Sequence, residues 1–256
     1  MELAQKVGFE TELRVADQLR SAGWSQAQNV YYIDKDEAKG RELDIRAHRG
    51  FASKEEDPKV TCRIFLCIEV KRTLEPFIFF TSPPDRHERG MGYGLFHWKN
   101  RVTRNHLSYV DIERKRPGSK AARLGRSYAA FKDGKGQQIQ SGVLSAVKAV
   151  IYNADNTDET WDDTSRDICF FIPVLVIDGP LWECFIDEDG GKLSAKEIDE
   201  VVYVQNYLSE NYGDIRGQVH VMTPDKFYKS LKNYTAWGND LLATMIKSRK
   251  AADPID

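Results

Sequence analysis

The chain contains an almost unbroken apolar run from Ile168 to Ile177, and this run constrains the fold more than any other feature. A strand with one solvent-facing side alternates apolar and polar residues, whereas a strand buried on both faces is apolar throughout. The run therefore predicts an interior strand of a sheet that carries helices on both faces. A shorter apolar run, Ile64–Ile68, lies inside a second long predicted strand at 60–72.

Hydrophobic periodicity and turn residues indicate the remaining elements of an α/β fold. In the first predicted helix Glu12, Val15 and Leu19 share one face. Near the C-terminus Thr223 and Pro224 form a good helix start, with threonine as the N-cap and proline in the first turn. The predicted helices cover residues 4–22, 120–131, 137–153 and 223–249, the last with a break at Gly238, and the predicted strands cover 29–33, 42–48, 60–72, 77–80, 168–177, 181–186, 201–205 and 218–222, with 181–186 as the hairpin partner of 168–177.

The length of 256 residues suits a single domain over 1–256 that carries an insertion. Between about residues 75 and 135, prolines and glycines interrupt the periodicity repeatedly. A structureless stretch of this length is unusual inside a compact domain, so we interpret it as a functional insertion with short elements of its own. The expected architecture is a mixed sheet with flanking helices and one large insertion.

The composition excludes several classes of protein. With 41% hydrophobic and 30% charged residues the chain has the balance of a soluble globular protein. It holds no apolar stretch of the roughly 18–20 residues that a membrane-spanning helix needs, and its N-terminus lacks the layout of a signal peptide. The four cysteines form no CxxC pair and have no histidine at zinc-binding spacing, which favours buried, reduced thiols. We therefore expect a cytoplasmic protein without a membrane partner.

Candidate catalytic residues occur in two short segments. Asp44 lies in the predicted strand at 42–48, and Glu69 and Lys71 lie at the end of the strand at 60–72. On an extended chain residues i and i+2 point to the same face, so Glu69 and Lys71 emerge together. If the two strands pair, the carboxylates of Asp44 and Glu69 come within about 8 Å of each other, close enough for one ion to bind both.

These residue types suit the hydrolysis of a phosphodiester. Two carboxylates favour a hard divalent cation such as Mg²⁺, which binds oxygen ligands and keeps several waters. A neighbouring lysine can orient or deprotonate one of those waters, or stabilise charge on a phosphoryl oxygen. Asp44, Glu69 and Lys71 therefore indicate a metal-dependent phosphodiesterase.

The order of these motifs resembles the PD-(D/E)xK nuclease superfamily, in particular its Mrr-type and Holliday-junction-resolvase-like branch. Asp44 matches the first acid, and Glu69-Val70-Lys71 matches the (D/E)xK element. The resemblance covers roughly residues 5–72 and, more loosely, the helix after residue 135. Leu43 stands where the family has the proline of its Pro-Asp pair, a departure that the family tolerates. The resemblance implies a restriction-endonuclease-like fold.

The same resemblance implies a cofactor and further site residues. The cofactor would be Mg²⁺ or Mn²⁺, held by Asp44 and Glu69, with the carbonyl of Val70 as an added ligand. Glu12, in register with the family's first helix, would assist through a second metal or a water. A Glu on an apolar helix face costs free energy unless it has a partner, and a surface pair with an arginine is the other interpretation of Glu12.

The helix after Glu-x-Lys supplies a supporting glutamine in the Mrr-like branch. This chain offers Gln137, Gln138 and Gln140, and Gln140 is the preferred candidate. The resemblance further implies an endonuclease that cuts DNA in antiviral defence, alone or as the effector of a larger assembly. Its regulation would come from oligomerisation, from a sensor or partner protein, or from the inserted segment.

Charge is segregated along the chain. Residues 86–135 hold 13 Lys and Arg against 4 Asp and Glu, whereas residues 136–256 hold 11 against 20. Lys and Arg release counterions from phosphates, and the interleaved aromatic residues can stack on bases. We therefore expect the basic segment to bind DNA; the alternative partner is the acidic C-terminal part of another copy in a homo-oligomer. The candidate DNA contacts are Arg101, Arg104, Arg114, Lys115, Arg116 and Arg123.

Three other interpretations fit the same residues. In the first, Glu69 and Lys71 form an ordinary surface ion pair at a strand end, which contributes little to stability. In the second, the chain is a catalytically silent nucleic-acid-binding subunit of a larger complex. In the third, the nuclease acts on RNA, because a phosphodiester site recognises the scissile group and not the sugar. Lys71→Ala separates an enzyme from a binding subunit, since only the enzyme would lose cleavage.

Overall fold

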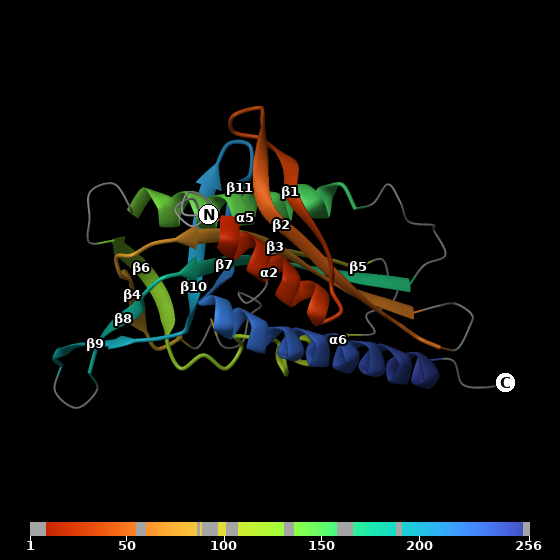
Figure 1. Cartoon of the computed structure of the whole chain (residues 1–256). Helices are drawn as coiled ribbons and strands as arrows, with labels where there is room; N and C mark the ends of the chain where they lie inside the picture. The colour runs from red at the N-terminus through yellow and green to blue at the C-terminus, as the bar shows by residue number, and fades with distance from the viewer. Residues whose placement is uncertain are drawn as a thin grey trace.

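A computed structural model shows that the chain is built around one mixed β-sheet (Figure 1). It describes residues 9–54, 60–85, 88, 97–100, 107–130, 136–157, 166–187 and 191–252. Ten strands follow one another in the order β1-β2-β3-β7-β11-β10-β6-β4-β8-β9, and the short β5 pairs with β7 outside this order. The strands are β1 (Ser25–Asp34), β2 (Lys39–Ala52), β3 (Val60–Arg72), β4 (Phe77–Ser82), β5 (His97–Asn100), β6 (Leu124–Ala130), β7 (Arg166–Asp178), β8 (Leu181–Ile186), β9 (Leu193–Glu197), β10 (Glu200–Ser209) and β11 (Gly213–Met222). The helices in the described part of the chain are α2 (Phe9–Ser21), α4 (Tyr109–Glu113), α5 (Gly136–Asp155) and α6 (Pro224–Ala252).

Strands β3 and β7 form the centre of the sheet. They run parallel in continuous register, from Val60 opposite Arg166 to Arg72 opposite Asp178. Strand β7 is buried from Ile168 to Ile177, as the apolar run predicts. On its other side it pairs with β5 near its beginning and with β11 near its end.

The side chains of these two strands alternate between two hydrophobic cores. Even-numbered residues, such as Leu66 and Phe170, pack in one core with α2 and α6. Odd-numbered residues, such as Cys67 and Phe171, pack in a second core with α5. Figure 1 accordingly shows α5 on one side of the central strands and α6 on the other. The sheet thus carries helices on both faces, and the odd-numbered Glu69 belongs to the face that α5 covers.

The ribbon of β1 and β2 twists sharply at Asp44. Leu43 packs in the core with α5, whereas Ile45, two residues further on, packs in the core with α2 and α6. Residues two apart on a regular strand share a face, so the pleat is interrupted between them. On β1 the residue opposite is Asn29, which has a positive φ of 51°. Pairing of β2 with β3 extends only as far as Ile45, so Asp44 stands where the two strands diverge.

The two central strands leave the middle of the sheet side by side. Strand β3 continues into β4 and β7 into β8, and β4 and β8 again pair in parallel. The N–H of Thr73 donates to the carbonyl of Asp178, and the N–H of Phe77 donates to that of Pro180. A Cβ on Gly179 would lie 2.3 Å from the carbonyl oxygen of Thr73, so this approach of the two backbones requires glycine.

The pairing of β8 overturns one prediction. Strand β8 is not the hairpin partner of β7; it pairs with β4 and β9. The turn residues after β7 carry the chain across to another part of the sheet instead of folding it back. Strands β4 and β6, both within the predicted insertion at 75–135, pair with each other there and so belong to the sheet.

Two predicted helices also need correction. Residues 124–130, inside the predicted helix at 120–131, form β6, because pairing with β4 and β10 overrides the local helical pattern. Helix α6 runs without a break through Gly238. A Cβ at Gly238 would lie 2.2 Å from the ring of Phe51, so this glycine allows α6 to pack closely on β2. The predicted start of the first helix before residue 9 lies outside the described residues. None of the helices within the described ranges is both long and apolar enough to cross a membrane.

Candidate active site

Glu69 and Lys71 project from the end of β3 toward α5. Glu69 is only 4% exposed, and its Oε1 accepts a hydrogen bond from the hydroxyl of Ser145 at 2.7 Å. Lys71 packs against Gly142, about one turn earlier on the helix, where a Cβ would lie 3.2 Å from Cε of the lysine. The small residue therefore lets α5 approach the end of β3 closely.

Asp44 reaches the same place from β2. Its Oδ2 accepts a hydrogen bond from the backbone N–H of Val70 at 2.7 Å. The last regular pair of β2 and β3 is Ile45 opposite Ile68. Beyond this pair the N–H of Val70 has no backbone acceptor on β2, and the side chain of Asp44 accepts its hydrogen bond instead. This bond holds the carboxylate beside Lys71.

Lys71 joins the two carboxylates. Its Nζ donates to Oε2 of Glu69 at 2.6 Å and lies 3.7 Å from Oδ2 of Asp44. Because both oxygens are next to one nitrogen, the carboxylates are nearer to each other than the roughly 8 Å that one ion can bridge. The structure therefore brings Asp44, Glu69 and Lys71 into one cluster.

Burial dominates the electrostatics of this cluster. It raises the pKa of Glu69 to about 7, although the ammonium of Lys71 acts in the opposite direction. Burial also lowers the pKa of Lys71, but the carboxylates of Glu69 and Asp44 outweigh it, and the pKa of Lys71 is raised. One ammonium is thus set against two carboxylates, which leaves an excess of negative charge when both are ionised.

Glu12 lies at the border of the cluster, on α2. Its side chain is half-buried, and burial raises its pKa, with Asp44 adding to the rise and Lys71 opposing it. The neighbouring hydroxyl of Thr11 donates to the carboxylate of Asp178 at the end of β7, which attaches the beginning of α2 to this edge of the sheet. The structure therefore brings the third predicted acid within electrostatic range of the other two.

The predicted glutamine does not reach the cluster. Gln140 is exposed, and it lies about 200° around α5 from Gly142, which packs against Lys71. The helix therefore points Gln140 away from β3. The side chains of Gln137 and Gln138 lie outside the described residues.

The donors in this cluster fit Mg²⁺ or Mn²⁺. Both ions prefer oxygen ligands, and Mg²⁺ is usually bound by one or two carboxylates together with several waters. Asp44 and Glu69 supply two carboxylates, and the carbonyl of Val70 is a further oxygen in the adjacent backbone. Among the described residues no three or more His, Cys, Asp and Glu side chains form a group that could hold a metal ion. The excess of negative charge that the cluster carries when both carboxylates are ionised is the structural observation that favours a cation.

Sequence reasoning missed two residues that contact this site. The hydroxyl of Tyr32 donates to Oγ of Ser145 at 3.2 Å, and Ser145 in turn donates to Glu69. The sequence does hold a signal for Ser145, because its hydroxyl stands among the apolar residues of the helix predicted at 137–153. No comparable pattern marks Tyr32, because its approach to α5 depends on the twist of the β1–β2 ribbon.

Arg116 does not fit its predicted role as a nucleic-acid contact. Its side chain is 4% exposed and donates to both Glu113 and Gln218. The contacts of this buried guanidinium are internal, so they do not support the predicted contact of Arg116 with a phosphate. Arg101 and Arg104 lie outside the described residues.

The other basic candidates are engaged in ion pairs but are accessible. Arg114 and Lys115 both pair with Asp240 of α6, and their side chains remain 50% and 57% exposed. Arg123 donates to Glu183 and lies 3.8 Å from the ring centroid of Phe185. All three border a groove of about 1070 Å³ that α6 also lines. Since α6 covers the face opposite α5, Arg114 and Lys115 lie across the sheet from Glu69.

Comparisons of the chain with protein-family models, with curated proteins and with solved structures find no match. The function proposed below therefore rests on the residues and the geometry of the site.

Proposed function

We propose that the protein is a metal-dependent endonuclease that hydrolyses phosphodiester bonds of DNA. The observation that carries the proposal is the contact of one ammonium, Lys71, with the carboxylates of Glu69 and Asp44 at the end of β3. An ordinary surface ion pair would be exposed, whereas Glu69 is buried and held by a second donor from α5. A buried acid with a strongly raised pKa beside a specific charge partner is typical of catalytic sites.

Asp44 and Glu69 would hold Mg²⁺ or Mn²⁺, with the carbonyl of Val70 as a further ligand. The bound cation would stabilise negative charge on the phosphoryl group and on the leaving 3′-oxygen. The chain contributes a rigid pair of ligands, because Asp44 is bound to the backbone of β3 and Glu69 to α5. Rigid ligands need little rearrangement when a cation and a substrate bind.

Lys71 is the residue that would act on the attacking water. Because its pKa is raised, the side chain is an ammonium at neutral pH. It therefore orients the water and donates to a phosphoryl oxygen, instead of removing a proton. Glu12, at the border of the cluster, would assist through a water or through a second metal site.

Two further observations support this function. The order of the motif-bearing elements resembles that of the PD-(D/E)xK superfamily: a helix with Glu12, then a strand with Asp44, then a strand with Glu-Val-Lys. A mixed sheet with helices on both faces is compatible with a restriction-endonuclease-like fold. On this basis the protein would act in the cytoplasm in defence against foreign DNA, as an effector controlled by oligomerisation, by a sensor or partner protein, or by the basic segment.

Incubation with supercoiled plasmid, linear duplex, single-stranded DNA and RNA tests this function, each in Mg²⁺, Mn²⁺, Ca²⁺ or EDTA. We expect cleavage of DNA in Mg²⁺ or Mn²⁺, poor cleavage in Ca²⁺ and none in EDTA. Lys71→Met, which keeps an unbranched side chain of nearly the same length but not its charge, should bind DNA in Ca²⁺ and fail to cut it in Mg²⁺.

Each alternative has a distinct outcome in the same experiment. Cleavage of RNA alone would change the polymer but keep the chemistry. Binding without cleavage in every metal would support the silent binding subunit. Cleavage that persists in EDTA, or that Lys71→Met retains, would contradict the proposal.

A further inference from the structure

We propose that Ser145 and Tyr32 are positioning residues for Glu69, forming a chain of neutral hydrogen-bond donors that orients this carboxylate toward Lys71 and Asp44. The inference deepens the proposed function and rests on it, because Glu69 is the carboxylate that would bind the cation. Neither hydroxyl is itself proposed as a ligand.

The two oxygens of Glu69 have separate donors. Ser145 donates to Oε1 at 2.7 Å, and Lys71 donates to Oε2 at 2.6 Å. With both oxygens held, rotation of the carboxylate would break at least one of the two bonds. Its plane is therefore fixed, and Oε2 is kept on the side where Asp44 lies.

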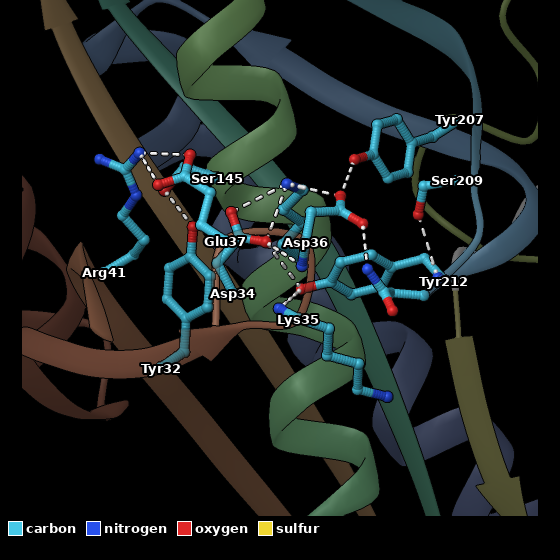
Figure 2. A network of polar contacts seen from close by, with 12 residues as sticks. Tyr32, Asp34, Lys35, Asp36, Glu37, Arg41, Ser145, Tyr207, Ser209 and Tyr212 are labelled. Carbon is cyan, nitrogen blue, oxygen red and sulfur yellow. Dashed lines mark hydrogen bonds and ion pairs between the residues drawn. The ribbon is translucent and has the colours of Figure 1, made fainter. Parts of the chain in front are cut away.

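Tyr32 determines which way the hydroxyl of Ser145 points. A serine hydroxyl has one hydrogen to donate and lone pairs to accept with. The hydroxyl of Tyr32 donates to Oγ of Ser145 at 3.2 Å, as Figure 2 shows. Since Oγ accepts from this direction, its own hydrogen is left for Glu69.

Neutral donors suit a carboxylate that has to bind a cation. A second lysine or arginine beside Glu69 would hold it equally well, but it would add a positive charge that opposes the cation. Hydroxyl groups orient the carboxylate and leave its charge available. With neutral donors at Ser145 and Tyr32, Lys71 is the one ammonium that contacts the two carboxylates of the cluster among the described residues.

The strand that carries Tyr32 is attached to α5 at a second point. Asp34, two residues further along β1, accepts two contacts from Nζ of Lys148, at 2.9 and 2.8 Å. Tyr32 and Asp34 share a face of β1, and Ser145 and Lys148, three residues apart, share a face of α5. Two neighbouring positions of the strand thus meet two neighbouring positions of the helix.

The second attachment is itself enclosed. Lys148 is 7% exposed; it also contacts Asp36 at 3.0 Å and lies 5.3 and 5.4 Å from the ring centroids of Tyr207 and Tyr212. Figure 2 shows Asp34 and Asp36 between these tyrosines of the β10–β11 hairpin and the helix. Several contacts would have to break before this end of β1 could move. Tyr32 therefore approaches Ser145 from a rigid support, which positioning of a metal ligand requires.

Binding of Mn²⁺ to the protein without DNA, measured by electron paramagnetic resonance, tests the inference together with cleavage kinetics. Ser145→Ala should weaken Mn²⁺ binding and lower kcat by roughly 10–100-fold, the usual effect of losing a partner of a metal ligand. KM for DNA should stay at the parental value, because the change acts through Glu69. Tyr32→Phe should reduce the same two quantities less, and Ser145→Thr, which keeps the hydroxyl, should restore them.

Matched variants control for side effects. Tyr31 neighbours Tyr32 on β1, but its hydroxyl donates to Glu42, and Ser230 is a buried serine of α6. Tyr31→Phe and Ser230→Ala should therefore leave Mn²⁺ binding and cleavage unchanged. Thermal unfolding of every variant is measured in parallel; if Ser145→Ala does not fold, Tyr32→Phe provides the test.

The outcomes separate the two proposals. If the parent binds Mn²⁺ and cuts DNA, and Ser145→Ala and Tyr32→Phe do so equally well, this inference is overturned and the proposed function stands. If Ser145→Thr shows the same loss as Ser145→Ala, the hydroxyl is not the cause and the inference is also overturned. A parent protein that neither binds Mn²⁺ nor cuts overturns both.

Discussion

Oδ2 of Asp44 accepts a hydrogen bond from the backbone N–H of Val70 at 2.7 Å, at the point where β2 stops pairing with β3. A candidate metal ligand thus also completes the backbone hydrogen bonding of the strand that carries Glu69 and Lys71. The twist of the β1–β2 ribbon at the same residue allows this contact. Asp44 therefore has a structural role besides the chemical role proposed for it, and substitutions can separate the two.

Asp44→Asn keeps an oxygen for the N–H of Val70 but removes the charge. We expect it to abolish plasmid cleavage while the free energy of unfolding in urea stays close to that of the parent. Asp44→Ala should abolish cleavage as well and also lower the free energy of unfolding by about 1–3 kcal/mol, since a buried N–H loses its partner. Cleavage by Asp44→Asn at the parental rate would exclude Asp44 as a metal ligand.

Gly179→Ala should destabilise the paired connections that lead from β3 to β4 and from β7 to β8. The added Cβ would lie 2.3 Å from the backbone oxygen of Thr73, so one of the two connections has to shift. We expect the free energy of unfolding in urea to fall by about 1–3 kcal/mol or more. Gly40→Ala is the control, because a Cβ there has nothing within 4 Å and should change stability by no more than about 0.5 kcal/mol. Equal stability of the two variants would contradict this account of Gly179.

Stability should depend on pH through His220. Burial, with a contribution from Arg116, lowers the pKa of His220 to about 3, from an ordinary value of 6.5. Between these values the unfolded chain binds a proton that the folded chain does not. The free energy of unfolding should therefore fall as the pH falls from about 6.5 toward 3, by up to about 1.4 kcal/mol per pH unit from this group. Well above pH 6.5 His220 is neutral in both states and has no such effect.

His220→Gln provides the comparison for this pH dependence. Nδ1 of His220 shares a hydrogen bond with the hydroxyl of Tyr234, and a glutamine amide can bond that hydroxyl without titrating. Urea unfolding from pH 4.5 to 7.5 should show a shallower loss of stability in acid for the variant than for the parent. Parallel curves for the two proteins would show that His220 does not cause the dependence.

Charge reversal at Arg114 and Lys115 tests the basic segment. Both side chains are half-exposed beside the groove under α6. If they contact phosphates, reversing both should weaken DNA binding for all sequences and reduce the slope of log K against log salt by about two units. Arg216→Glu is the control, since Arg216 is similarly exposed but belongs to β11. Unchanged binding and salt dependence would favour a protein partner for this segment, and oligomeric state would be measured next.

Local patterns in the sequence determined the central elements of this protein. The strand predicted at 60–72 coincides with β3, and the predicted strand at 168–177 and helix at 137–153 lie within β7 and α5. The shared direction of Glu69 and Lys71 also follows from sequence, because covalent geometry makes side chains alternate along any strand. Apolar runs and alternation are properties of neighbouring residues, and so they can be read without knowing the fold.

Only the tertiary structure decided how these elements meet. The twist that carries Asp44 to Val70, the pairing of β8 with β4 and the enclosure of Arg116 all join residues far apart in the chain. The same holds for the contact of Tyr32 with Ser145, which depends on how the β1–β2 ribbon lies on α5. These contacts depend on which surfaces pack together and on the need of buried polar groups for hydrogen-bond partners. The spacing of residues along one segment encodes neither of these two factors.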